Sequence, residues 1–365
     1  MQCRYLLLGG TGAMGYYLKD ELKNNGGDVY VTSRRHRESS DGIHYLCGDA
    51  HDTVFLKRVM SEVKPDVIVD FMVYGTSEFS ERYEFLLDNS MQYIYLSTYR
   101  VFANTRPLVE SSPRLLDVCD DVEYLKTDEY ALSKARQEDI LRGSQYKNWT
   151  IVRPSITYSK KRFQFGCLEA GIVCFRALNG LPVVIPDEML DKQTTMTWAK
   201  DVARMISKLA MNPCAMHEDF NVVTSESHTW REILEVYHSA LGLKVETVSM
   251  KDYLTICATY QTKYDRMFDR VMDNSKVLRV AGMTQSKLTP TAVGLAKELE
   301  AFKKEPVYQY GVDVGASAKM DRICGTRTPI YGLSLRQKLV YYRCRYSWVG
   351  QIGAMAASIK TLLKH

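Results

Sequence analysis

Short apolar runs alternate with longer amphipathic segments along the first part of the chain. The runs at Tyr5–Leu8 and Val67–Phe71 are apolar almost throughout, which is typical of parallel strands covered on both faces. Further strands are expected at 28–32, 43–46, 93–96 and 149–152, and helices at 13–23, 54–63, 78–87 and 128–141. This alternation predicts a doubly wound parallel sheet, which binds ligands where its strands end.

The remaining segments are less regular. Residues 103–125 are rich in Pro, Ser and Asp and are expected to form a loop. Thr229 and Glu232, three residues apart at the start of one expected helix, match a capping box. Beyond residue 152, helices are expected at 168–178, 199–209, 230–241 and 292–303, and strands at 181–186 and 220–223. The pattern therefore predicts an α/β protein throughout, with the more regular part first.

The composition is that of an ordinary globular protein. Of the 365 residues, 45% are hydrophobic and 25% are charged. No apolar run approaches the roughly 18–20 residues that a membrane-spanning helix needs, and no signal peptide is expected. The nine cysteines form no CxxC pair and do not cluster with histidines, so we expect reduced thiols, a cytoplasmic protein and no metal site. We interpret each cysteine as structural or incidental.

The positive charge is concentrated at the C-terminal end. The formal net charge is +5, but residues 322–365 hold eight Lys or Arg and no acidic residue, so the rest of the chain is slightly negative. Tyr341, Tyr342, Tyr346 and Trp348 lie among these basic residues, and a small-apolar stretch follows. Such a segment can lie on an anionic membrane, bind nucleic acid, or pack as a helix on the body or on a partner. Nucleic acid is the least favoured of these.

A glycine-rich turn follows the first expected strand. The sequence from Cys3 reads CRYLLLGGTGAMG, in which Gly9, Gly12 and Gly15 fall three residues apart and Gly10 stands beside the first. Such a turn lets the backbone pass close to a pyrophosphate, whose charge is met by amides at the N-terminus of the next helix. The pattern favours a dinucleotide site, although glycine-rich turns also occur without a ligand.

The end of the second expected strand bears on which dinucleotide binds. An acidic residue there would accept hydrogen bonds from the ribose hydroxyls of NAD, whereas arginine accommodates the 2′-phosphate of NADP. The sequence has Ser33, Arg34 and Arg35 at this point and no acid. This favours NADP, with NAD as the alternative, while a solvated basic loop would explain the same residues without a ligand.

Tyr130 and Lys134 lie four residues apart in an expected helix, and therefore on one face of it. A nearby ammonium favours the phenolate and lowers the pKa of the tyrosine, which makes it a better proton carrier near neutral pH. The alternative is an ordinary surface pair. This is the only YxxxK segment in the sequence, and it lies between the expected strands at 93–96 and 149–152.

These motifs stand in the order found in the extended short-chain dehydrogenase/reductases. The chain resembles their NAD(P)-dependent epimerase/dehydratase group, which acts mostly on nucleotide-activated sugars. GGTGAMG resembles the cofactor turn of that family, Gly48-Asp49 its adenine-recognising aspartate, and YLSTYRVF at 95–102 its serine/threonine strand end. IVRP at 151–154 matches the strand that leads to the nicotinamide. The resemblance continues through TWAKDVA at 197–203 and DNSK at 273–276, over about residues 1–303.

The resemblance implies hydride chemistry at a sugar carbinol. Tyr130 would exchange a proton with the sugar oxygen, and Lys134 would hold the nicotinamide ribose and lower the pKa of the tyrosine. Thr98 would hydrogen-bond the reacting oxygen, with Ser97 as the neighbouring hydroxyl that could be confused with it. The expected cofactor-binding residues are Gly9, Gly10, Thr11, Gly12, Ala13, Met14, Gly15, Ser33, Arg34, Arg35, Asp49, Ala50, Phe71, Met72, Ser97, Tyr130, Lys134, Pro154, Ser155 and Ile156.

Two departures from the family pattern bear on the reaction. The chain is short between Phe71 and Tyr93, where the usual Asn-containing helix segment is not recognisable. Tyr99-Arg100 follows Thr98 where the dehydratases have Asp-Glu, which disfavours 4,6-dehydration. With the basic strand end, this predicts an NADPH-dependent ketosugar reductase. A nucleotide-sugar epimerase with tightly bound NAD(P) is the close alternative, and a non-catalytic nucleotide- or RNA-binding member of the superfamily is the third.

The expected organisation is a Rossmann-type core at 1–155, a smaller substrate-binding lobe at 156–305 with some return to the core, and a basic C-terminal extension at 306–365. The expected partners are a nucleotide-diphosphate sugar and a second copy of the chain, because dimers are common in the family. The basic run at 160–162 could meet the diphosphate of the sugar nucleotide, although such a run is more often a solvated face. Nucleic acid is not an expected partner. Peripheral membrane contact through the extension is a further expectation, since glycan assembly takes place at that surface.

Overall fold

The computed structural model describes residues 2–346 of the chain. They form two compact units. The first comprises the residues up to 159 together with 193–228 and 268–295, and the second comprises 160–192, 229–267 and the residues from 296 onward. Segments 193–228 and 268–295, from the range expected to form the substrate-binding lobe, therefore belong to the first unit.

The first unit is built on a parallel sheet. Among the described residues this sheet has seven strands in the order β13-β6-β5-β4-β1-β2-β3, and each neighbouring pair is parallel. The strands are β1 (Arg4–Leu8), β2 (Asp28–Ser33), β3 (Ile43–Cys47), β4 (Val67–Asp70), β5 (Gln92–Leu96), β6 (Trp149–Arg153) and β13 (Glu218–Asn221). The strand order reverses between β1 and β4, and such a switch point opens a crevice at the carboxyl ends of the strands. The doubly wound sheet expected from the sequence is confirmed.

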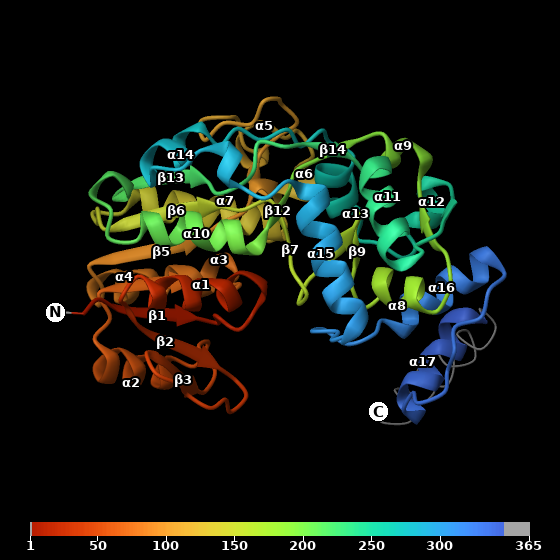
Figure 1. Cartoon of the computed structure of the whole chain (residues 1–365). Helices are drawn as coiled ribbons and strands as arrows, with labels where there is room; N and C mark the ends of the chain where they lie inside the picture. Colours follow the sequence, from red (N-terminus) through yellow and green to blue (C-terminus); the bar gives the residue numbers. More distant parts are fainter. Residues whose placement is uncertain (1, 347–365) are drawn as a thin grey trace, which may run out of the picture. The chain divides into compact units, whose positions relative to one another are not determined.

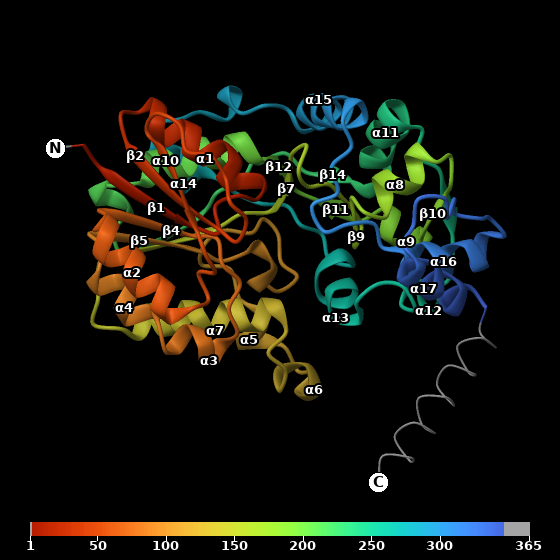
Figure 2. The same cartoon turned by 90° about the horizontal axis from the view of Figure 1, so that it is seen from below.

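Helices cover both faces of this sheet (Figure 1, Figure 2). Alternate residues of each strand point to opposite faces, so Leu7 contributes to one core and its neighbours Leu6 and Leu8 to the other. The first core includes residues of α1 (Ala13–Asn24), α10 (Ala199–Leu209) and α14 (Ser275–Ala281). The second includes residues of α2 (Thr53–Val63), α3 (Thr76–Ser80), α4 (Tyr83–Asp88) and α7 (Tyr130–Gly143). The continuously apolar strand sequences follow from this burial on both sides.

Two stretches of the first unit differ from the sequence expectation. The helix expected at 78–87 is broken into α3 and α4, because the Arg82 Nε donates to the Glu78 carbonyl at 3.1 Å, an acceptor that a continuous helix would use for itself. The expected loop at 103–125 contains two short helices, α5 (Leu115–Val118) and α6 (Val122–Leu125). The Asp121 side chain caps α6 by accepting from the Tyr124 backbone N–H at 2.9 Å.

The second unit has short strands and several helices. Its strands are β8 (Gln164–Phe165), β9 (Leu168–Glu169), β10 (Val183–Ile185) and β15 (Val245–Thr247). Its helices are α8 (Val173–Leu178), α9 (Asp187–Leu190), α11 (Trp230–Leu241), α12 (Met250–Tyr253), α13 (Thr259–Gln261), the π-helical turn η3 (Thr262–Arg266), α16 (Val314–Cys324) and α17 (Leu335–Arg345). Helix α15 (Thr291–Lys304) begins in the first unit, and its residues from 296 onward belong to the second. The capping box of α11 is confirmed, since Thr229 and Glu232 each accept from the other's backbone N–H. The helix expected at 168–178 begins only at Val173, because Leu168–Glu169 pairs with β8 in a hairpin.

The described part of the basic extension is folded. Arg176 of α8 and Asp321 of α16 form a fully buried ion pair with Nη1 3.0 Å from Oδ1, and Tyr341 of α17 donates to the same carboxylate at 2.8 Å. Within residues 2–346, no helix is both long and apolar enough to cross a membrane. Trp348 and the small-apolar stretch after it lie outside the described residues.

Candidate active site

The glycine turn joins β1 to α1 at the switch point of the sheet. Gly9 has a φ of +68°, a value that favours glycine, and its N–H donates to the Thr32 hydroxyl at 2.8 Å. A Cβ on Gly15 would lie 2.3 Å from the Gly10 carbonyl oxygen, so the helix can approach the turn only with glycine there. Gly12 is the N-cap of α1, and in the described chain no side chain caps this helix. Its first N–H groups are therefore free to meet a phosphate.

The ends of β2 and β3 lie beside this turn. Ser33 closes β2, and its hydroxyl donates to the Arg35 carbonyl at 2.8 Å and accepts from the Arg37 Nε at 3.3 Å. These bonds shape the loop and leave the Arg34 and Arg35 side chains exposed. Asp49 follows β3 with an exposed side chain, while its neighbour Ala50 is buried. A basic loop and an acidic residue thus flank the carboxyl edge of the sheet.

Phe71 and Met72 follow β4 on the other side of the switch point. The Phe71 N–H donates to the Leu8 carbonyl at 3.0 Å, which carries the β1–β4 pairing one step past the strands. The Met72 sulfur lies so close to Gly9 that a Cβ there would meet it at 2.8 Å. These two expected cofactor residues therefore adjoin the glycine turn.

The hydroxyls of Ser97 and Thr98, at the end of β5, differ in what they contact. Ser97 is buried and donates to Glu138 Oε1 at 2.5 Å, which holds it in a structural ion network. Thr98 begins the short 3₁₀ turn Tyr99–Val101, and its Oγ1 accepts only a long bond of 3.3 Å from the Arg100 N–H among the bonds described. Its hydroxyl proton is thus available for another acceptor. The geometry favours Thr98 over Ser97 as the group that meets a substrate oxygen.

Tyr130 and Lys134 lie on the first turns of α7. Glu129 caps this helix, since its Oε2 accepts from the Ala131 N–H at 2.8 Å, and Tyr130 is the next residue, half-buried. The Lys134 side chain is 2% exposed and its Nζ donates to the Leu96 carbonyl at 2.7 Å, two residues before Thr98. Helix α7 therefore brings Lys134 to the end of β5, which is close to Thr98 in the sequence.

Burial changes the acid–base behaviour of this region. It lowers the pKa of Lys134 to about 8, although the Asp70 and Glu138 carboxylates act in the opposite direction. It raises the pKa of Asp70, which nonetheless accepts from the Tyr93 hydroxyl at 2.8 Å. A buried lysine whose pKa falls towards neutral pH is typical of acid–base sites.

Sequence reasoning missed the residues that support this arrangement. Glu138 of α7 is fully buried and pairs with Arg153 of β6 at 2.8 Å, and Arg153 also contacts Asp219 of β13 at 2.9 Å. The charge of Arg153 and its neighbours lowers the pKa of Glu138 despite burial. Glu138 lies one turn beyond Lys134, and this i,i+4 spacing was the available signal.

Arg100 is a further residue near Tyr130. Its position after Tyr99 was noted from the sequence, but no contact was assigned to it. Its Nη2 lies 2.6 Å from Glu129 Oε1, and its guanidinium lies 5.2 Å from the centroid of the Tyr130 ring. A cation over the ring face holds the ring by cation–π attraction. The second position after Thr98, where the dehydratases have an acid, therefore bears a cation over the Tyr130 ring.

Pro154, Ser155 and Ile156 follow β6. The Pro154 carbonyl accepts from the Tyr99 N–H at 3.1 Å, which ties this segment to the 3₁₀ turn after Thr98. Ile156 begins β7 (Ile156–Tyr158), which pairs in parallel with β12 (Met196–Trp198). The structure thus gathers the expected residues of the first unit at the carboxyl ends of its strands.

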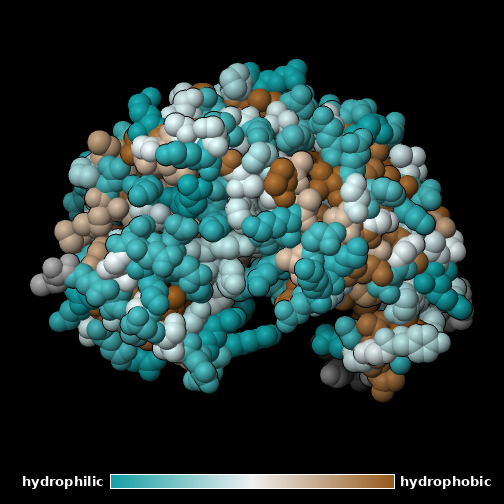
Figure 3. Space-filling view, in the orientation of Figure 1, coloured by the Kyte–Doolittle hydropathy of each residue, from teal (hydrophilic) through white to brown (hydrophobic). Residues whose placement is uncertain are grey.

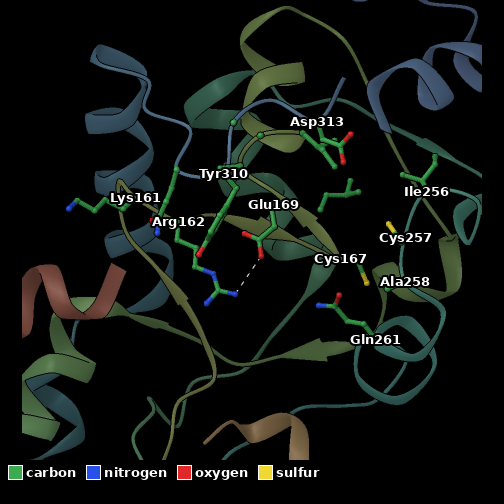
Figure 4. A pocket seen from close by; sticks show the side chains of 16 residues that line it. Lys161, Arg162, Cys167, Glu169, Ile256, Cys257, Ala258, Gln261, Tyr310 and Asp313 are labelled. Atoms are coloured by element: carbon green, nitrogen blue, oxygen red, sulfur yellow. Dashed lines mark hydrogen bonds and ion pairs between the residues drawn. The ribbon is translucent and has the colours of Figure 1, made fainter. Parts of the chain in front are cut away.

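The second unit contains a cavity of about 360 Å³ (Figure 4). Its walls come from the segment after β7, the β8–β9 hairpin, the turn before α13 and the loop before α16. Arg162 reaches Glu169 Oε1 at 3.5 Å, and its Nε is buried with no hydrogen-bond partner among the described residues. Within those residues, no group of His, Cys, Asp and Glu side chains could hold a metal ion.

The residues of the first unit fit a dinucleotide. The glycine cradle admits no Cβ at Gly15, and the N-terminus of α1 is uncapped. Fold and site together define a dinucleotide-binding α/β protein.

Residues 5–222 match the model of the NAD dependent epimerase/dehydratase family. The chain belongs to this family, which confirms the resemblance drawn from the sequence, and it is an NAD(P)-dependent enzyme of the short-chain dehydrogenase/reductase type. No curated protein sequence is similar enough to count as a match.

Solved structures share the fold at low sequence identity. The enzyme WbmH of Bordetella bronchiseptica, in complex with NAD+, has a TM-score of 0.64 at 14% identity, over 84% of this chain and 100% of its own. The UDP-glucose 4-epimerase of Thermus thermophilus, in complex with NAD, has a TM-score of 0.60 at 20% identity, over 83% and 100%. That of Thermotoga maritima, with UDP-glucose, has a TM-score of 0.60 at 18% identity, over 82% and 99%.

Proposed function

We propose that this protein is an NADPH-dependent reductase of a nucleotide-diphosphate ketosugar. The observation that carries the proposal is the burial of Lys134 at the end of β5, with Thr98 two residues past the carbonyl that it contacts and Tyr130 one turn before it on α7. Three groups of the kind needed to deliver a proton to a ketone oxygen thus share one edge of the sheet. The UDP-glucose in a structure of the same fold supports a nucleotide sugar as the substrate class.

The roles of the three residues follow from their chemistry. A bound nicotinamide dinucleotide supplies the hydride in this chemistry. Tyr130 Oη would donate a proton to the carbonyl oxygen of the sugar as negative charge develops there, while the Thr98 hydroxyl donates a hydrogen bond to the same oxygen. Lys134, with a pKa of about 8, would stabilise the tyrosinate left behind.

The preference for NADP rests on the loop after β2. Arg34 and Arg35 are exposed there, and Ser33 shapes the loop through its bonds to Arg35 and Arg37. Two guanidinium groups favour a 2′-phosphate. The double substitution R34S/R35S should raise the Kd for NADPH at least tenfold and leave that for NADH within twofold, measured by calorimetric titration. Equal losses for both cofactors would refute the preference.

The cavity of the second unit is the proposed site for the diphosphate of the substrate. Lys161 and Arg162 line it, and the buried Arg162 Nε has no partner among the described residues. The substitution Arg162→Gln should therefore raise KM for the sugar nucleotide and leave kcat almost unchanged. Unchanged KM would show that the diphosphate binds elsewhere.

The decisive experiment compares Tyr130→Phe with wild type on a 4-keto-sugar nucleotide and NADPH. We expect a loss of at least 100-fold in kcat with cofactor affinity retained, because only the proton carrier is removed. Tyr146→Phe, which removes a surface hydroxyl bonded to Asp88, is the matched control and should leave activity unchanged. Undiminished turnover by Tyr130→Phe would refute the catalytic assignment.

The same assay separates the reductase from its alternatives. Net oxidation of NADPH in step with product is expected. Interconversion of sugar isomers with no net change in cofactor would establish the epimerase instead, and the NAD bound in the WbmH and Thermus structures keeps that alternative open. An absence of turnover with tight RNA binding would favour the non-catalytic alternative.

We also propose that α17 contacts an anionic membrane surface. Leu335 and Leu339 are 80% and 71% exposed, and with Tyr342 they lie on one face of the helix, between Lys338 on one side and Arg343 on the other. Figure 3 shows apolar colour in the region that α17 occupies in Figure 1. An apolar ridge with basic flanks is typical of helices that lie in the plane of an anionic bilayer.

Sedimentation with vesicles tests this contact. The protein should bind vesicles that contain phosphatidylglycerol and not those of phosphatidylcholine alone, and the double variant L335D/L339D should lose binding. Retained binding by that variant, or binding to RNA in place of vesicles, would refute the proposed membrane contact.

Analytical ultracentrifugation without vesicles tests the other proposed partner, a second copy of the chain.

A further inference from the structure

Two cysteines that are 90 residues apart in the sequence lie together in the wall of the second-unit cavity. Cys167 is in the turn between β8 and β9, and Cys257 is in the segment between α12 and α13. Each thiol is close enough to the other to shift its pKa. Figure 4 shows both sulfur atoms on the same side of the cavity, near Ala258 and Gln261. A molecule that enters the cavity can therefore reach this pair.

The surroundings of Cys167 favour its thiolate. Its Sγ lies 3.4 Å from the Thr262 hydroxyl, and its backbone N–H donates to the Tyr253 hydroxyl at 3.0 Å. Arg266 comes from the same π-helical turn as Thr262, and its Nε donates to the Gly166 carbonyl at 2.7 Å, which places a positive charge next to residue 167. A π-helical turn inside a fold often marks a functional position.

The two thiols differ in acidity. Burial opposes ionisation of Cys167, and Asp265 acts in the same direction, but hydrogen bonds from Cys257 and Thr262 and the charge of Arg266 outweigh them, so the pKa of Cys167 falls to about 7. The hydrogen bond to Cys167, together with burial, raises the pKa of the Cys257 thiol above its usual range. The pair thus combines an ionisable nucleophile with a protonated neighbour, as in reactive dithiols.

We propose that Cys167 and Cys257 form a thiol modification site, which a hydroperoxide entering the cavity oxidises to a reversible disulfide. The proposal does not depend on the reaction proposed above. The Cys167 thiolate attacks one peroxide oxygen, an S–O bond forms, the O–O bond breaks, and the leaving hydroxide takes a proton to become water. The Cys257 sulfur then attacks the Cys167 sulfur, an S–S bond forms, the S–O bond breaks, and the second water leaves with the Cys257 proton. Two thiols are oxidised and one hydrogen peroxide is reduced to two waters.

The other cysteines provide the comparison within the same chain. All nine lie in the described range and are unbridged, and Cys47 and Cys214 are the two with exposed side chains. Exposure alone would make these two react first. Thiolate character would instead make Cys167 react first below pH 8, although it is partly buried.

The first experiment uses the reduced full-length protein and iodoacetamide, with labelled peptides quantified by mass spectrometry from pH 5.5 to 9. We expect labelling of Cys167 to rise with an apparent pKa near 7 and to exceed that of Cys214 at least fivefold at pH 6.5. Labelling of Cys214 faster than Cys167 throughout this range would overturn the assignment of a reactive thiolate.

The second experiment treats the full chain with hydrogen peroxide, blocks the remaining thiols and maps peptides without reduction. We expect a linked Cys167–Cys257 peptide that disappears after dithiothreitol. In Cys257→Ser, Cys167 should stop at the sulfenic acid and be trapped by dimedone, whereas the control Cys214→Ser should still form the bridge. Peroxide consumption without a linked peptide in wild type, or the same Cys167 product in wild type and Cys257→Ser, would overturn the proposal. The wild-type mapping stands even if a variant fails to fold.

Discussion

Lys134 gives the sharpest test of the structure, because its burial has a consequence for stability that can be calculated. Its pKa is lowered from 10.5 to about 8 by burial. Each unit of pKa shift corresponds to about 1.4 kcal/mol, so the buried ammonium opposes folding by about 3 kcal/mol at neutral pH. Between pH 8 and 10.5 the unfolded chain binds more protons at this group than the folded one, so this contribution makes stability rise with pH across that window.

The assay compares wild type with Lys134→Met by urea unfolding at pH 7, 8, 9 and 10, followed by tryptophan fluorescence. Groups common to both proteins largely cancel in the difference between the two free energies of unfolding. This difference, wild type minus variant, should become more favourable to wild type by about 2–3 kcal/mol from pH 7 to pH 10. A flat difference, or one of opposite sign, would refute the burial of a titrating ammonium at this position.

The remaining predictions concern the cofactor cradle and the second unit. Gly15→Ala should weaken dinucleotide binding at least tenfold in calorimetric titration, since its Cβ would lie 2.3 Å from a carbonyl oxygen, whereas Gly143→Ala, with open space around it, should bind normally. Equal affinities would show that the turn relaxes. Arg176→Ala leaves the Asp321 carboxylate buried without its cation and should cost about 3–5 kcal/mol in urea unfolding. Arg231→Ala, which removes an exposed ion pair, should leave the midpoint of urea unfolding nearly unchanged. A similar loss of stability in the Arg176 and Arg231 variants would refute the role assigned to burial.

Short-range patterns in the sequence predicted most of the helices and strands of the first unit. The helix at 199–209 was predicted with the boundaries that the structure has, and the Thr229–Glu232 capping box appears as expected, because both depend on residues within one or two turns. Predictions were wrong where a short-range contact, not visible in the apolar pattern, replaced the hydrogen bonds of a helix. Arg82 occupies a backbone carbonyl and breaks the helix expected at 78–87, and pairing with β8 draws 168–169 out of a helix.

The candidate site shows the same division. Tyr130 and Lys134 were visible from their spacing, but nothing local to Thr98 indicated that Ser97 is bonded to Glu138 and Thr98 is not. The nine cysteines were interpreted as structural or incidental because no two of them are close in sequence in a CxxC pattern. Only the fold brings Cys167 next to Cys257.

The uncapped N-terminus of α1 has a consequence for the protein before it meets any substrate. Gly12 offers no side chain to the first turn, so the N–H groups of that turn depend on water until a phosphate arrives. A bound dinucleotide would thus complete the helix, and amide hydrogen exchange in this turn should slow when it binds. Because a ligand that binds only the folded state stabilises it, the fraction of chains that survives proteolysis in a cell would rise and fall with the pool of the dinucleotide.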